Sequence, residues 1–239
     1  AGLVRPGDLW AMLRGAVCRT LAEQRRSGRL PINDSKKLHS KAAGLSHLEA
    51  GCLSVARLAG CSWQRLDDWL ATLQGERELP ACPPWYGAGD GRPWCTLPRV
   101  ITAQQLGIAA AMLQREADKA GVTCREVGAA VVFEDRFNDM VAATRSKAAM
   151  SFTFVAKHLA AIWQRFGEHQ PFVAVDRQSG RTHYRELLAL SFPQAHLRIL
   201  HESDRCSGYR LEAGERAMTV VFEVDGEASH LPVAAASMT

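Results

Sequence analysis

The sequence has no long apolar run, and this bears on where the chain can reside. None of its apolar stretches approaches the ~20 residues that a membrane-spanning helix requires. The opening segment, AGLVRPGDLW, has no apolar core after its first arginine, so it does not resemble a signal peptide. We therefore expect no membrane partner for this chain.

Several chemical motifs are also missing. The seven cysteines are scattered without a C-x-x-C pair, which argues against a zinc ribbon or a thioredoxin motif. Their odd number and scatter favour free thiols and a cytoplasmic location. The sequence also lacks H-E-x-x-H, G-x-G-x-x-G, G-x-x-x-x-G-K-[ST] and G-x-S-x-G. Metalloprotease, nucleotide-binding and serine-hydrolase hypotheses therefore lose support.

The composition that remains is that of an ordinary globular protein. Hydrophobic residues make up 47% and charged residues 23% of the 239 positions, which suits one large domain or two small ones. The formal net charge of +4 permits nucleic-acid binding without demonstrating it.

Hydrophobic periodicity predicts an α/β chain without internal repeats. Helices are expected over 8–21, from Ser46 to Gly60, over 62–74, from Thr102 to Gly121, and over 138–166 and 181–190. Strands are expected over 126–133, 171–176 and 196–201, with a hairpin of 208–212 and 217–224. Strands alternating with helices in the second half indicate an α/β sheet that includes an antiparallel hairpin.

Two polar segments interrupt this pattern. Residues 23–37 are expected to form an exposed loop, after which Ser46 and Glu49 have the spacing of a capping box. Residues 75–99 are rich in proline and glycine and carry Trp85, Tyr86 and Trp94. They are expected to form a surface loop pinned by aromatic packing, or else a flap that stacks bases.

Acidic residues follow two of the predicted strands. Asp176 ends an apolar strand, where α/β sheets present ligand-binding acids, although it could instead cap the next turn. Glu223, Asp225 and Glu227 follow a later strand. Neighbouring carboxylates repel unless a cation lies between them, and Mg²⁺ prefers carboxylate oxygens. The alternative is a solvated acidic turn.

Basic residues gather in two places. Asn33-Asp34-Ser35-Lys36-Lys37-Leu38 is compatible with a helix N-cap followed by exposed lysines, or with a loop that contacts phosphates. Arg177, Arg181 and Arg185 cluster beside Asp176 and suit either a nucleic-acid backbone or an ordinary surface. His183 and His230 have no catalytic spacing and are expected to be structural or surface residues.

The segment 33–38 resembles the corresponding motif of ribonuclease HII, in the ribonuclease-H-like superfamily. The order of the later pieces is also similar: a strand, a long helix holding Asn138 and Lys147, a strand ending at Asp176, and an acid before a small-residue helix. GEASHLPVAAASM resembles the family's glycine–aspartate and alanine–alanine–serine helix. It places Glu227 at the aspartate, with Asp225 as a shifted alternative. The resemblance covers scattered patches from about 33 to 239.

The resemblance implies a ribonuclease-H-like mixed sheet flanked by helices, in a single domain over 1–239, and a monomer. It implies an endonuclease that cleaves RNA in RNA/DNA hybrids by two-metal hydrolysis. Asp176 and Glu227 would be catalytic, and with Asp225 they would hold Mg²⁺ or Mn²⁺. Contacts to nucleic acid would come from Ser35, Lys36, Lys37, Arg177 and Arg181.

The sequence departs from the family in three ways. The family's adjacent aspartate–glutamate pair, which precedes the lysine motif, has no counterpart here, and glutamate replaces aspartate at 227. Residues from about 50 to 100 resemble an insertion. We therefore expect a partial domain, cut at both ends and lacking its first strand or strands, and expect this chain alone to be inactive.

Two other functions fit the same departures. A catalytically inactive nucleic-acid-binding protein with a decayed ribonuclease-H-like core would lack the acidic pair altogether. A metal-dependent nuclease or recombinase of the same fold would act on branched or all-DNA substrates instead.

Overall fold

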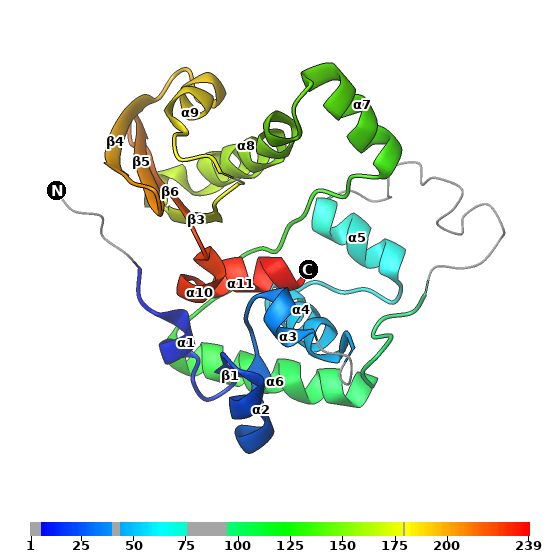
Figure 1. Cartoon of the computed structure of the whole chain (residues 1–239). Helices are drawn as coiled ribbons and strands as arrows, with labels where there is room; N and C mark the ends of the chain where they lie inside the picture. Colours follow the sequence, from blue (N-terminus) through cyan, green and yellow to red (C-terminus); the bar gives the residue numbers. More distant parts are fainter. Residues whose placement is uncertain (1–5, 40–43, 76–94, 179) are drawn as a thin grey trace. The chain divides into compact units, whose positions relative to one another are not determined.

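A computed structural model describes residues 6–39, 44–75, 95–178 and 180–239 (Figure 1). The chain divides into two compact units. The sheet unit comprises residues 1–7 and 138–233, and the helical unit comprises residues 8–137 and 234–239. Helices and a mixed sheet occur together, which confirms the predicted α/β class. The aromatic residues Trp85, Tyr86 and Trp94 lie outside the described residues.

The sheet unit is built on four strands in the order β3-β6-β5-β4. Their bounds are β3 (Phe172–Asp176), β4 (His196–Glu202), β5 (Cys206–Ala213) and β6 (Arg216–Glu223). β3 runs parallel to β6, whereas β5 pairs antiparallel with both β6 and β4. The β5–β6 hairpin forms as predicted and turns at Gly214, whose φ of +58° suits glycine.

Two helices supply the core of this unit. Alternate residues of β5 and β6 pack against α8 (Lys147–Phe166) and α9 (Arg185–Ser191). A short helix, α10 (Gly226–Ser229), follows β6. Phe222 is fully buried at the centre, and its ring stacks on Tyr184 with 3.6 Å between centroids. The hydroxyl of Tyr209 accepts a hydrogen bond from the backbone N–H of Tyr184 (2.9 Å). Aromatic packing therefore joins α9 to the middle of the sheet.

The long helix predicted over 138–166 is wrong. The structure has two helices, α7 (Glu134–Thr144) and α8, separated at Arg145, whose φ is +51°. The Ser146 hydroxyl then accepts a bond from the Ala149 N–H and caps α8. This cap satisfies a backbone N–H that a continuous helix would pair internally. Apolar periodicity does not register such a polar cap, so the periodicity of the sequence did not reveal the break. The helix predicted over 181–190 likewise begins only at Arg185.

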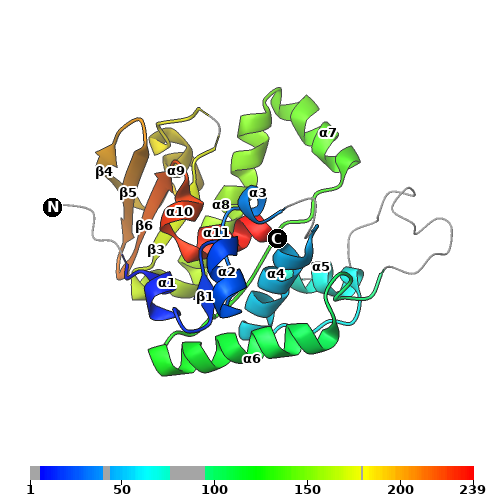
Figure 2. The same cartoon turned by 60° about the horizontal axis from the view of Figure 1, so that its bottom comes forward.

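The helical unit contains short elements followed by longer helices. They are α1 (Leu9–Met12), β1 (Val17–Cys18), α2 (Leu21–Ser27), β2 (Leu30–Pro31), α3 (Ser35–Leu38), α4 (Ser46–Leu58), α5 (Leu66–Gln74) and α6 (Ala103–Ala120), and the last residues of α11 (Leu231–Met238). α4 packs against α6 (Figure 2). α6 begins after Thr102, which forms a capping box with Gln105, and Gly121 is its C-cap, so both ends lie where the sequence predicts. Among the described residues, no helix is long and apolar enough to cross a membrane.

The first predicted helix and loop of this unit are also wrong. Residues 8–21 form only the short helix α1 before the chain turns into β1, which pairs in parallel with β2. Thr20 and Glu23 form a capping box that starts α2 inside the expected loop. Pairing between segments separated in the chain overrides the helical period here.

The strand predicted over 126–133 does not form. These residues have no strand partner; instead the Ala129 N–H donates to the carbonyl of Leu73 (2.8 Å) and the Val131 N–H donates to Oε1 of Gln74 (3.1 Å). Val127 and Ala129 pack against the cluster around Trp69 and Leu106. The apolar sequence is therefore explained by burial beside the end of α5.

Glu49 has a role different from the predicted capping box. The N-cap of α4 is Leu45, without a side-chain bond, while the Glu49 carboxylate accepts from the backbone N–H groups of Val100 (2.7 Å) and Ile101 (2.8 Å). We expect Glu49→Ala to lower the free energy of unfolding by about 1–3 kcal/mol, because the exposed Val100 N–H and the half-buried Ile101 N–H lose a charged acceptor. Denaturant unfolding measures this, with Asp118→Ala, on the exposed side of α6, as control. An effect no larger than that of the control would contradict the prediction.

The Cys52 thiol, on α4, should react more slowly with alkylating reagents than the Cys95 thiol. It is 7% exposed, and burial raises the pKa of its thiol to about 11. A raised pKa keeps the thiol protonated at pH 8, so alkylation by iodoacetamide should be on the order of a hundredfold slower than for an ordinary thiol. Peptide mass spectrometry, with half-buried Cys95 as the internal reference, measures the rate. Equal rates in the folded chain would refute the prediction, while unfolding should equalise them.

Candidate active site

The parallel pairing of β3 and β6 brings two acids together. Asp176 and Glu223 are register partners at the carboxyl ends of these strands. Neighbouring strands lie about 4.8 Å apart, so two carboxylates emerge side by side at one edge of the sheet. The sequence placed each acid at a strand end, but only the register shows that they are neighbours.

The chain after β6 folds back onto Asp176. Asp176 is exposed, and its Oδ1 accepts a hydrogen bond from the backbone N–H of Gly226 (3.2 Å). Asp225 adopts a left-handed conformation with φ of +56°, which turns Gly226 toward this carboxylate. Asp176 is therefore held by the turn at the end of β6, in a position fixed before any ligand arrives.

Glu223 is held by a histidine that sequence reasoning had assigned no chemical role. Nε2 of His230 lies 2.9 Å from Oε2 of Glu223, and the two side chains are only 10% and 14% exposed. The His230 ring also lies 5.9 Å from that of Phe172. Glu223 belonged to the predicted acidic cluster but not to the predicted ligands. Its pairing with His230 could not be read from spacing alone.

The other two predicted metal ligands lie in the segment that follows β6. The Asp225 carboxylate is 65% exposed and pairs with Nη2 of Arg205 at 3.3 Å. Glu227 is half-buried in the first turn of α10. Within the part of the chain that the structure describes, no three His, Cys, Asp or Glu side chains form a group able to hold a metal ion. Asp176 and Glu223 are thus neighbours at one sheet edge, and the described acids form no complete ligand set.

The lysine motif forms a capped turn of helix in the helical unit. Asp34 accepts from the Lys36 N–H (3.0 Å) as N-cap of α3, and the Asn33 side chain donates to the carbonyl of Arg19 (2.6 Å). Lys36 and Lys37 are exposed. The interpretation of this motif as an N-cap followed by exposed lysines is confirmed, and its contact with phosphate stays a prediction.

The two segments that carry the family resemblance meet in space. The Ser35 N–H donates to Oγ of Ser237 (3.2 Å), and the two hydroxyls lie 3.3 Å apart. These residues are 202 positions apart in the sequence. Ser35 and Ser237 therefore lock the lysine motif against the small-residue helix.

The arginines beside Asp176 already have partners. Nη1 of Arg177 donates to the carbonyl of Asp204 at 2.5 Å. The Arg181 guanidinium lies 5.9 Å from the centroid of the Tyr184 ring. Both can present positive charge, but their geometry is set by the protein.

Comparison of the chain with protein-family models, with curated proteins and with solved structures gave no match.

Proposed function

We propose that the chain carries part of a metal-dependent endonuclease similar to ribonuclease HII, which cleaves the RNA strand of RNA/DNA hybrids. The observation that carries this proposal is the register of β3 and β6, which puts Asp176 beside Glu223. Glu223 ends β6, and Glu227 follows it in α10. The contact between Ser35 and Ser237 supports it, because it joins the two motifs on which the resemblance rests.

The donor chemistry at this sheet edge suits a hard divalent cation. Asp176, Asp225 and Glu227 offer carboxylate oxygens, which Mg²⁺ and Mn²⁺ prefer. The described residues do not complete a three-donor group, so the proposal requires additional ligands such as the acidic pair of the family. When bound, the ions would supply an activated water and would neutralise the leaving oxygen.

The protein's own contribution would be to hold the substrate and the acids. Gly226 holds Asp176 through a backbone N–H, so this carboxylate need not reorganise when ligands bind. Lys36 and Lys37 would contact backbone phosphates, and Ser35 would fix their helix against Ser237. Arg177 and Arg181 would add positive charge beside Asp176.

A second function, binding of nucleic acid without cleavage, is favoured by one specific observation. Two of the acids already have internal partners: Glu223 pairs with His230, and Asp225 pairs with Arg205. These two pairs would neutralise the carboxylates of Glu223 and Asp225 without a metal ion, so the fold could bind nucleic acid without cleaving it. We therefore keep this proposal beside the first, as a protein that binds hybrids in the cytoplasm.

One experiment separates the two proposals. The chain is mixed with a DNA duplex containing ribonucleotides in one strand, and binding is followed as salt rises, with and without Mn²⁺. Both proposals expect binding that weakens with salt, because lysine and arginine side chains release the counterions condensed on the phosphates. The assay is then repeated with the product of the complete reading frame. Mn²⁺-dependent cleavage at ribonucleotides supports the nuclease, binding without cleavage supports the alternative, and absence of binding by either product overturns both.

A further inference from the structure

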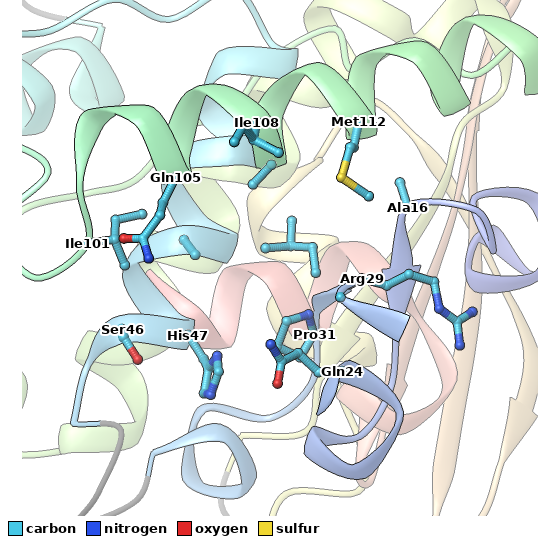
Figure 3. A pocket seen from close by; sticks show the side chains of 14 residues that line it. Ala16, Gln24, Arg29, Pro31, Ser46, His47, Ile101, Gln105, Ile108 and Met112 are labelled. Carbon is cyan, nitrogen blue, oxygen red and sulfur yellow. The ribbon is translucent and has the colours of Figure 1, made fainter. Parts of the chain in front are cut away.

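A pocket in the helical unit lies away from every residue assigned above. Its volume is about 350 Å³, within the ordinary size range of small-molecule sites (Figure 3). It is lined by α6 and Ile101 on one side, and by α2, β2 and the start of α4 on the other. All of these segments belong to the same compact unit.

One wall of this pocket is apolar. Ile108, Ala109 and Met112 of α6 line it. Figure 3 shows Ile108 and Met112 projecting from this helix. Ile108 is 56% exposed, which leaves a large apolar side chain open to water at the pocket. A flat apolar group placed against these side chains would remove that surface from water, which is favourable by the hydrophobic effect.

The opposite side of the pocket carries polar side chains beside the apolar residues Leu30, Pro31 and Ala50. Gln24, Ser46 and His47 face the α6 wall from below in Figure 3, and Gln105 lies at one end beside Ile101. These carboxamide, hydroxyl and imidazole groups offer both donors and acceptors. An acyl chain would desolvate them without pairing them, whereas a nucleobase edge presents matching donors and acceptors.

The charge around the pocket is positive. Of the described residues that line it, none carries a carboxylate, and Arg29 and His47 are the ionisable ones. Arg29 is braced by the Ser27 hydroxyl (2.9 Å) and the carbonyl of Arg14 (2.8 Å). Burial, and then the charge of Arg25, lowers the pKa of His47.

The acids nearest in sequence are engaged elsewhere. Glu23 accepts from the backbone of Arg19 and Thr20, and Glu49 accepts from the backbone of Val100 and Ile101. Their carboxylates therefore bond to backbone amides, and Arg29, just after α2, supplies the positive charge at this end of the pocket. Positive charge at one end favours an anionic group on the ligand.

We propose that this pocket binds a nucleotide, with the base against the α6 wall and the phosphate toward the basic end at Arg29. This chemistry occurs both in a free nucleoside monophosphate and in the 5′-phosphorylated end of a strand. The site goes beyond the proposed nuclease and does not depend on it.

The test follows the methyl group of Met112 by NMR in the whole chain labelled at methionine methyls, with Met112→Leu to assign the signal. The probes are AMP, GMP, CMP and UMP, a 5′-phosphorylated oligodeoxynucleotide, and decanoate. We expect a saturable shift of the Met112 signal with at least one mononucleotide or with the oligonucleotide. A response to mononucleotides identifies the free ligand, and a response to the oligonucleotide alone identifies a strand end.

Matched charge variants on α6 locate the binding. Ile108→Glu adds an acid at an exposed position of the pocket and should weaken binding about tenfold or more, whereas Ala111→Glu adds the same charge at an exposed position outside the lining and should change it less than about twofold. The proposal is overturned if only decanoate shifts Met112, if nucleotides bind without shifting it, if no probe binds, or if both variants bind alike.

Discussion

Asp176→Asn should abolish metal-dependent cleavage of ribonucleotide-containing duplexes by the product of the complete reading frame, while hybrid binding persists. The substitution removes the charge but keeps an oxygen that can accept the Gly226 N–H, so the turn after β6 should be preserved. Under the proposed two-metal mechanism, loss of this carboxylate corresponds to a fall in kcat of about 10³-fold or more, or about 4 kcal/mol. Steady-state cleavage in Mn²⁺ measures the rate, and gel-shift titration measures the binding.

Glu168→Gln is the matched control for Asp176→Asn. Glu168 lies in the 3₁₀ turn before β3, where it pairs with Arg216 (3.5 Å) at the opposite end of the strand. Neutralising it removes the same unit of charge from the same sheet unit and should leave cleavage within about twofold, because an exposed ion pair contributes little. If Asp176→Asn cleaves as well as Glu168→Gln, the assignment of Asp176 is wrong.

Phe222→Ala should cost the sheet unit about 3–5 kcal/mol, the range for removing a buried aromatic ring and leaving a cavity. Phe222 is fully buried, stacks on Tyr184, and also approaches the rings of Phe152 (6.5 Å) and Tyr209 (6.4 Å). Its loss therefore loosens α8, α9 and β5 together. Hydrogen–deuterium exchange of peptides from β5 and β6 should accelerate strongly.

Leu190→Ala provides the comparison for the core variant. Leu190 is on α9 in the same unit but is 78% exposed, so its truncation should change the free energy of unfolding by less than about 0.5 kcal/mol. Exchange in α4 of the helical unit reports whether the effect of Phe222→Ala stays local. Equal exchange in β5 and β6 for the two variants would show that Phe222 is not the centre of this core.

The sequence by itself determined the features that depend on neighbouring residues. The β5–β6 hairpin, the strand that ends at Asp176 and the start of a helix at Thr102 were all predicted, because strand alternation, helix caps and glycine turns act over a few positions. The N-cap at Asp34 was visible for the same reason. Periodicity misled where a short-range signal competed with it, as at Ser146, whose side chain starts a second helix.

Only the tertiary structure decided which distant residues meet. The parallel register that places Asp176 beside Glu223, the pairing of Glu223 with His230 and the contact between Ser35 and Ser237 all join segments that the chain order leaves apart. Residues 126–133 have a strand-like sequence, yet they lie against α5 because their donors found acceptors at Leu73 and Gln74. A backbone group or side chain can bond to any partner that packing brings near, and local sequence does not specify that partner.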